Sequence, residues 1–351
     1  MPRVAYLKDK PMRDPFTSRA AGHYGHFYLW EGHEVIELNS EQLTVKVSLN
    51  RGAEIFELRD KRKNVDLLWH NHEDIVRNRP YISSRNSEFG NFLEHFSGGW
   101  QEVLPAAQYP VEYKGVKVGG HGEAALLSWN FEILHDEPEE LKIKLWVDLR
   151  LFPLRLTRVM TLRNEKLRFD EEVENLGAEK IDFQWGQHLV LGGPLAEPGA
   201  ELKVDDGEPF TVPHYPSPTY RFEVDQSGSW PEIRTSRGST EDLLELPAND
   251  GSDGHVILGP MKRPEVSLAN KKLGLQATMQ WGKDSYPYCW IWMVWGGIKQ
   301  YPLWGAHRLV TIEPFSSPVI SLTEAIENGT ALTAQPGGIV SSWVEFTVTE
   351  I

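Results

Sequence analysis

Three titratable side chains stand out because each lies at a glycine turn or at a strand end. They are His121 within residues 119–123, His188 within residues 185–189 and Glu313 within residues 311–314. Two imidazoles and one carboxylate that meet in one pocket can move protons to and from neighbouring oxygens of a neutral substrate near neutral pH. This chemistry suits the oxygens of a sugar better than those of a phosphate group.

The immediate surroundings of His121 and Glu313 support such a role. His121 lies between glycines, so backbone or ligand can approach it closely. Glu313 follows the apolar residues 309–312 and precedes Pro314, so we expect it at the end of a buried strand. Partial burial raises the pKa of a carboxyl group and makes its carboxylate a better base.

His188 is predicted to end a polar row on one face of a strand. Alternation along residues 180–191 separates this row from the apolar row of Ile181, Phe183 and Trp185, and the polar row consists of Asp182, Gln184, Gly186 and His188. A polar row on a sheet face lines a groove rather than a core. We therefore expect His188 to be accessible to a ligand.

The rest of the chain has the sequence pattern of β-sheet, and this sheet must position the three residues. Period-two alternation predicts half-buried strands over 43–49, 142–149, 180–185 and 343–348, separated by turns rich in Gly, Pro and Asp. Helical periodicity is hard to find, and there is no alternation of strands with helices. The pattern favours an all-β protein of large, packed antiparallel sheets.

We interpret residues 1–351 as a single β-sandwich domain with an N-terminal extension over 1–40. The candidate boundary is the loop-rich segment 215–254, where prolines, Ser227-Gly228-Ser229 and acidic residues interrupt the strand pattern. Strands on both sides have the same character, and the titratable residues fall on both sides. The segment therefore reads as an excursion from one sandwich, of the kind that often carries function.

Composition restricts the partners. The net charge of -14 argues against nucleic acid and anionic membranes, because both require basic surface. A single cysteine, Cys289, excludes an intrachain disulfide and a multi-cysteine metal site. No apolar run has the length of a secretory signal or of a membrane-spanning helix. We therefore expect a cytoplasmic protein that binds a neutral or cationic small ligand.

Four segments, taken in order, resemble the galactose mutarotase-like family of aldose 1-epimerases. They are residues 97–105, 121–123, 185–200 and 312–315, and the similar region extends from about Arg51 to the carboxyl end. The resemblance implies a large antiparallel β-supersandwich and a reaction without metal or organic cofactor. It also implies that His188 is the general acid, that Glu313 is the base, and that His121 helps to bind the sugar at its ring and anomeric oxygens.

The same resemblance suggests further sugar contacts. Family members use an aspartate and an arginine on sugar hydroxyls, for which Asp253 and Arg85 are the nearest candidates. Trp100, Gln101 and Trp292 lie in or beside the informative segments, and aromatic faces suit the C–H faces of sugar rings. We therefore predict that all five contact the monosaccharide.

One departure from the family concerns phosphate. Members that act on hexose 6-phosphates follow their His-Gly pair with an aromatic residue, alanine and arginine, whereas this chain has Glu123-Ala124-Ala125 after Gly122. Phosphate is usually held by cationic side chains or helix N-termini. A carboxylate beside His121 predicts repulsion of a phosphate dianion, and hence a preference for a free sugar.

Three other functions remain open from the sequence alone. His70-Asn71-His72-Glu73 could supply two imidazoles to a cupin-type metal site, although such a site requires three or four ligands. Glu102 and Glu313 could form the carboxylate pair of a glycosidase, which would leave both histidines without a role. The chain could also be a sugar-binding protein without turnover, because a fold can persist when its activity is lost.

Overall fold

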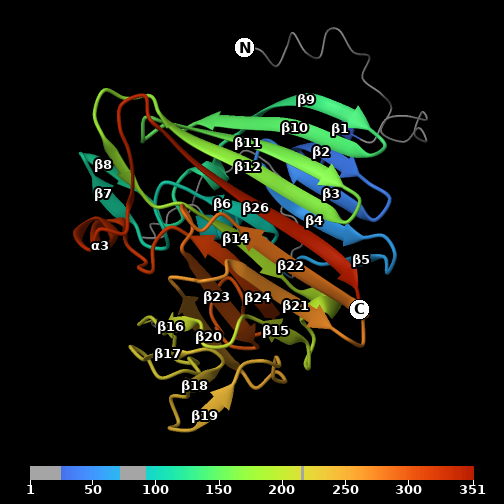
Figure 1. The fold of residues 1–351 in the computed structure, drawn as a ribbon, viewed down its shortest axis with the longest axis vertical. Helices are drawn as coiled ribbons and strands as arrows, with labels where there is room; N and C mark the ends of the chain where they lie inside the picture. Colours follow the sequence, from blue (N-terminus) through green and yellow to red (C-terminus); the bar gives the residue numbers. More distant parts are fainter. Residues whose placement is uncertain (1–24, 72–91, 215–216) are drawn as a thin grey trace.

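The computed structural model describes residues 25–71, 92–214 and 217–351. Almost all regular structure in these residues is antiparallel sheet, and Figure 1 shows the strands gathered into large layers. The predicted all-β fold class is therefore confirmed. None of the helices in the described part of the chain has the length and apolar character that crossing a membrane requires.

The first sheet has 12 strands and carries the candidate site. In spatial order its strands are β1 (Gly25–Trp30), β2 (His33–Asn39), β3 (Leu43–Ser48), β4 (Glu54–Asp60), β6 (Trp100–Val103), β14 (Gly186–Leu191), β24 (Arg308–Phe315), β23 (Tyr288–Trp295), β20 (Ser252–Leu258), β16 (Pro209–Thr211) and β17 (Ser227–Ser229), with β5 (Val65–Asp66) paired to β4. Strands that are far apart in sequence are therefore neighbours at its centre.

The second sheet has 8 strands and packs on one face of the first. Its strands in spatial order are β15 (Glu201–Lys203), β21 (Glu265–Asn270), β22 (Leu275–Trp281), β26 (Ile339–Glu350), β12 (Lys166–Asn175), β11 (Leu154–Arg163), β10 (Glu140–Asp148) and β9 (Asn130–Glu137). In Figure 1 the green strands β9 to β12 and the red strand β26 run side by side in this layer.

The main core lies between the two sheets and follows from the alternation of each strand. In β10, Ile143, Leu145 and Val147 are buried, while the intervening lysines and Trp146 are partly exposed. Leu38 and Val45 of the first sheet belong to the same apolar cluster. Each buried side chain of this size contributes about 1.5–3 kcal/mol of transfer free energy, so this interface is the main source of stability.

Shorter elements complete the chain. The paired strands are β7 (Val111–Tyr113) with β8 (Val116–Val118), β13 (Ile181–Phe183) with β25 (Leu332–Ala334), and β18 (Glu232–Arg234) with β19 (Thr240–Asp242). The helices are α2 (Phe92–His95), α3 (Leu322–Glu327) and the 3-10 turns η1 (Ala124–Leu126) and η2 (Gly193–Ala196). The segment that we read as a loop-rich excursion thus contains β17, β18 and β19.

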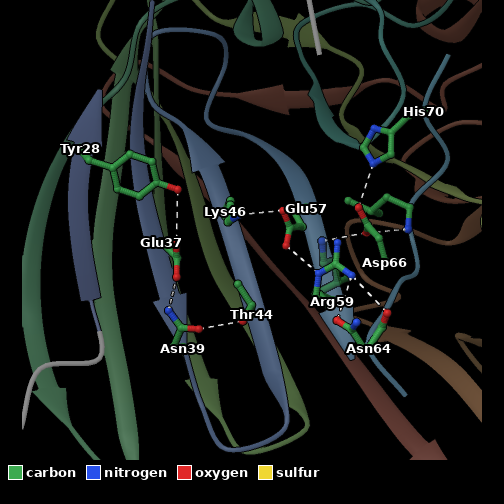
Figure 2. Close-up of polar contacts among 12 residues, drawn as sticks. Tyr28, Glu37, Asn39, Thr44, Lys46, Glu57, Arg59, Asn64, Asp66 and His70 are labelled. Carbon is green, nitrogen blue, oxygen red and sulfur yellow. Dashed lines mark hydrogen bonds and ion pairs between the residues drawn. The ribbon is translucent and has the colours of Figure 1, made fainter. Parts of the chain in front are cut away.

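The opposite face of β1 to β4 carries several polar side chains among aromatic ones such as Trp30 and Phe56. Figure 2 shows Tyr28 donating to Glu37, which also accepts from Asn39, and Lys46 pairing with Glu57 on the next strands. These cross-strand pairs satisfy the polar side chains of this face. Because β1 and β2 belong to this sheet, residues 25–39, which we had placed in an N-terminal extension, are part of the sandwich.

Candidate active site

A cavity of about 290 Å³ lies on the face of the first sheet that is turned away from the second. Its floor is formed by neighbouring strands: His188 from β14, Glu313 from β24, Trp290 and Trp292 from β23, and His255 from β20. The residues between them, such as Leu189, Ile312 and Ile291, belong to the core between the sheets. Alternation therefore exposes a polar group from each strand to the cavity.

His188 and Glu313 face each other across two antiparallel strands. Nε2 of His188 lies 3.8 Å from Oε1 of Glu313, and the two residues are only 5 % and 6 % exposed. Burial lowers the pKa of His188 to about 4. Burial also raises the pKa of Glu313 to about 8, against a smaller lowering effect of a hydrogen bond with Thr311. Near neutral pH the imidazole of His188 is therefore neutral and the carboxyl group of Glu313 is protonated.

His121 reaches the cavity from the turn before η1. Its backbone is in the left-handed region, with φ of 64°, and Gly122 follows with φ of 74°. A Cβ at position 122 would lie 2.1 Å from the carbonyl oxygen of Leu104, so only glycine fits there. The tight turn fixes the place of the imidazole, whose centroid is 5.6 Å from that of His188.

The His121 ring is enclosed by apolar neighbours. It stacks on Phe92 of α2 with a centroid distance of 4.0 Å and an interplanar angle of 5°. Burial, and then the proximity of His188, lowers the pKa of His121 to about 3, so the ring is neutral at pH 7. Its Nδ1 atom is buried and has no hydrogen-bond partner within the described residues.

A third histidine, His255, was missed by sequence reasoning. It lines the cavity from β20 and contacts Trp290 edge to face at a centroid distance of 5.5 Å. Burial, and then the nearby His188, lowers the pKa of His255 to about 3. A signal was present, because strand alternation places His255 on the same face as Asp253, two residues earlier.

Of the predicted sugar-contact residues, some line the cavity in the structure and others lie elsewhere. Trp292 lines the cavity, and its buried Nε1 has no hydrogen-bond partner among the described residues. Trp100 instead lies in the core between the sheets, where it donates to Gln187 and packs on Phe169. Its strand position points it toward the second sheet, so the predicted sugar contact of Trp100 is wrong. Arg85 lies outside the described residues.

Asp253 and Gln101 are not among the residues that line the cavity. Asp253 is fully buried, and its Oδ1 accepts hydrogen bonds from Ser217 and Thr219, at 2.7 Å from the Ser217 hydroxyl. Gln101 contacts the other ring nitrogen of His188, with Oε1 lying 3.2 Å from Nδ1. It therefore acts on His188 rather than directly on a ligand in the cavity.

The predicted polar row before His188 does not form one groove. β13 ends at Phe183 and β14 begins at Gly186, so the strand is interrupted. Asp182 accepts from Thr333, and the Gln184 side chain bonds the backbone of Ala107 and Val319. These side chains hold loops together, and of the row only His188 reaches the cavity.

Glu123 does not face the cavity, which corrects our argument about phosphate. Its carboxylate is buried and accepts backbone N–H groups of residues 150, 151 and 152, at 3.0, 2.9 and 3.3 Å. Glu123 therefore anchors a turn and is not among the residues that line the cavity. Among the described residues that line the cavity there is no lysine and no arginine.

Glu102 is also engaged elsewhere. It pairs with Arg158 of β11 and accepts from Trp185 and from Gln187, the latter at 2.9 Å. These contacts lie between the two sheets, and Glu102 does not line the cavity. A glycosidase that uses Glu102 with Glu313 is therefore excluded by the position of Glu102.

The His70 segment offers no metal site in the part of the chain that the structure describes. Figure 2 shows the His70 ring directed at Asp66, and its Nε2 lies 3.0 Å from Oδ2. His72 and Glu73 lie outside the described residues. No group of three or more potential metal ligands occurs among the residues that are described.

The comparison with protein families gives one match over most of the chain. The family described as Domain of unknown function (DUF4432) matches residues 30–348. No curated protein sequence matches significantly.

Solved structures resemble this chain across nearly its full length. The Slr1438 protein from Synechocystis is 15 % identical with a TM-score of 0.64, covering 93 % of this chain and 100 % of its own. A galactose mutarotase-like protein from Clostridium acetobutylicum is 12 % identical with a TM-score of 0.62, covering 95 % and 100 %. A galactose mutarotase related enzyme from Lactobacillus acidophilus is 16 % identical with a TM-score of 0.61, covering 90 % and 97 %. At these identities the likeness concerns the fold.

Proposed function

Because the chain belongs to the family described as Domain of unknown function (DUF4432) and has the galactose mutarotase-like fold, we propose that it interconverts the anomers of a free sugar. The observation that carries the proposal is the buried pair of His188 and Glu313, 3.8 Å apart at the cavity floor. A neutral imidazole beside a protonated carboxyl group can accept a proton from one substrate oxygen while the carboxyl group donates a proton to another nearby.

The reaction needs two such transfers. One member of the pair takes the proton of the anomeric hydroxyl, and the other gives a proton to the ring oxygen, so the C1–O5 bond breaks and the free aldehyde forms. Rotation about C1–C2 and the reverse transfers produce the other anomer. Each positioned proton transfer contributes about 10²- to 10⁴-fold, which is sufficient for a reaction that already proceeds slowly in water.

The walls of the cavity suit a monosaccharide ring. Trp290 and Trp292 offer aromatic surface, and Phe92 and Phe96 cover the opposite side near His188. Apolar C–H faces of a sugar pack on such rings. The buried Nδ1 of His121 and Nε1 of Trp292 are available for sugar hydroxyls, because neither has a hydrogen-bond partner among the described residues.

An unphosphorylated sugar is the better substrate for this cavity. The described lining has no cationic side chain, whereas a phosphate dianion requires cationic groups or helix N-termini. The three histidines are kept neutral near pH 7 by burial, so they add no positive charge. A dianion would lose its hydration without compensation.

Exchange NMR tests this proposal directly. Magnetisation transfer between the α and β anomeric protons is measured for a panel of free hexoses, 6-deoxyhexoses, pentoses and uronic acids, with and without the protein. We expect faster exchange for at least one neutral aldose, unchanged by a chelator. Rates equal to those in buffer for every sugar would refute turnover, and sugar-induced shifts in the protein spectrum would then favour a binding protein. Activity that a chelator abolishes would favour a metal enzyme.

A further inference from the structure

We infer that Gln101 is a positioning residue that keeps the proton of neutral His188 on Nδ1, so that Nε2 begins the reaction as the proton acceptor and Glu313 as the donor. The inference rests on the proposed function for its catalytic meaning, although the hydrogen-bond arrangement can be tested without it. It reverses the roles that the family resemblance implies, in which His188 is the acid and Glu313 the base.

The first step is the contact between Gln101 and His188. β6 and β14 pair so that Gln101 and His188 are directly opposite each other. Oε1 of Gln101 lies 3.2 Å from Nδ1 of His188, and both side chains are buried. The ring is also held by edge contacts from Phe92 and Phe96, with centroids 6.1 and 5.4 Å away. The imidazole therefore has little freedom to turn its other nitrogen toward Gln101.

The second step is the orientation of the amide. Nε2 of Gln101 donates to the carbonyl oxygen of Gly98. A carbonyl oxygen only accepts hydrogen bonds, so the amide nitrogen must face it. A flipped amide would place two oxygens against each other and would direct its NH2 group at His188. The amide oxygen is thereby assigned to the side of Nδ1.

The backbone around Gly98 is closely packed. Gly98 has φ of 96°, and a Cβ there would lie 1.9 Å from the carbonyl oxygen of Trp69. The buried Glu54 is nearby, and burial raises the pKa of its carboxyl group, against the lowering effect of Arg51. Glu54 is paired with Arg51. The Gly98 carbonyl oxygen is thus the acceptor that holds the amide nitrogen.

The third step follows from the tautomer. An oxygen acceptor at Nδ1 requires the proton there, which leaves a lone pair on Nε2. Nε2 is the atom that faces Glu313 at 3.8 Å. Among the described residues, His188 is the one ion-pair partner of Glu313, and no lysine or arginine lines the cavity. A buried carboxyl group without a cation retains its proton, so Glu313 is the donor.

The proton balance of ring opening is then complete. Nε2 of His188 takes the proton of the anomeric O1, the O1–H electrons form the C1=O1 bond, and the C1–O5 bond breaks. O5 takes the proton of Glu313. The products are the open aldehyde, a His188 imidazolium and a Glu313 carboxylate, which attract each other. After rotation about C1–C2 the same transfers in reverse restore the starting pair.

Nitrogen-15 NMR of the histidine-labelled protein tests the tautomer at pH 7 without sugar, with His188→Asn used to assign the signals. We expect a protonated Nδ1 and an unprotonated Nε2 in the native protein. Gln101→Met, which lacks the acceptor, should convert His188 to a mixture of tautomers, whereas Gln101→Glu, which keeps an oxygen there, should retain Nδ1–H. The control is Gln226→Met, since Gln226 is equally buried but bonds the backbone of Glu223 and Arg234, outside the cavity lining.

Infrared spectroscopy tests whether Glu313 carries the proton that it is proposed to donate. A protonated carboxyl band at pH 7 that disappears in Glu313→Gln is expected. In kinetics, Gln101→Met should lower kcat at least about tenfold with little change in KM, because partners that orient a histidine have effects of this size. A proton on Nε2 in the native protein, or no carboxyl band, would overturn the inference. An inactive protein with the expected spectra would instead refute the proposed function alone.

Discussion

Nε2 of His188 and Oε1 of Glu313 approach within 3.8 Å although 124 positions separate them in the sequence, because β14 and β24 are antiparallel neighbours in the first sheet. Leu189 pairs with Ile312, which places the preceding His188 beside the following Glu313 on the cavity face. The pairing register of two strands thus creates an acid and base pair that no local segment contains.

Removing either member of this pair should abolish most turnover. We expect Glu313→Gln and His188→Asn each to lower kcat by at least about 100-fold, the usual size of one positioned proton transfer. Exchange NMR at the anomeric protons gives kcat, and protein chemical shifts on titration with sugar report retained binding. Thermal unfolding serves as the control for folding. Near-native turnover in either variant would remove that residue from the mechanism.

The pH profile of kcat/KM should be bell-shaped. The active pair needs an unprotonated His188, whose pKa burial lowers to about 4, and a protonated Glu313, whose pKa burial raises to about 8. Activity is therefore expected to fall below about pH 4, as His188 gains a proton, and above about pH 8, as Glu313 loses its proton. In Glu313→Gln the residual activity should lack the alkaline decrease. If the decrease of kcat/KM at high pH persists in Glu313→Gln, the group that loses its proton is not Glu313.

His255 should contribute to sugar binding more than to proton transfer. Its side chain lines the cavity beside Trp290, on the strand next but one to that of Glu313. In His255→Phe the aromatic contact can be kept while hydrogen bonding is lost, so we expect KM to rise roughly tenfold, the value of about one hydrogen bond, with kcat within a few-fold of native. A drop in kcat at constant KM would assign His255 to the proton transfers.

Glu123 should contribute to the free energy of unfolding and should not affect the preference between free and phosphorylated sugars. Its buried carboxylate accepts three backbone N–H groups of residues 150–152, and hydrogen bonds to a charged group contribute about 1.5–3 kcal/mol each at most. Glu123→Ala should lower the free energy of unfolding by roughly 2 kcal/mol or more in urea denaturation. The exposed Glu132→Ala on β9 is the matched control. Improved use of sugar phosphates by Glu123→Ala would show that the Glu123 carboxylate repels the phosphate dianion.

Free sugars should be preferred over their 6-phosphates. The described cavity lining contains no lysine or arginine, so the phosphate dianion finds no counter-charge there. Competition of glucose and galactose with their 6-phosphates, at equal concentrations and two salt levels, measures the preference. Tighter and salt-sensitive binding of the phosphates would show that cationic groups outside the described lining reach the ligand.

Strand alternation was sufficient to predict the fold class and several strands. The predicted strands over 43–49, 142–149 and 343–348 correspond to β3, β10 and part of β26. Period two determines which residues of a strand share a face, and the motif resemblance brought His121, His188 and Glu313 together as candidates. The structure places all three around one cavity, while their catalytic roles remain proposals.

Only the tertiary structure decides whether a given face of a strand packs on the second sheet or lines the cavity. Alternation separates Gln187 from His188 but does not reveal that Gln187 meets the second sheet while His188 lines the cavity. For the same reason Trp100 was predicted to contact the sugar, and Glu102 was an alternative as one carboxylate of a glycosidase. Strand pairing places Trp100 in the core between the sheets and Glu102 beside Arg158 of the second sheet. Glu123 and Gln101 also take their roles from partners remote in sequence. The faces covered by a second layer, and the register between distant strands, depend on packing across the whole sandwich, and a local pattern carries no information about either.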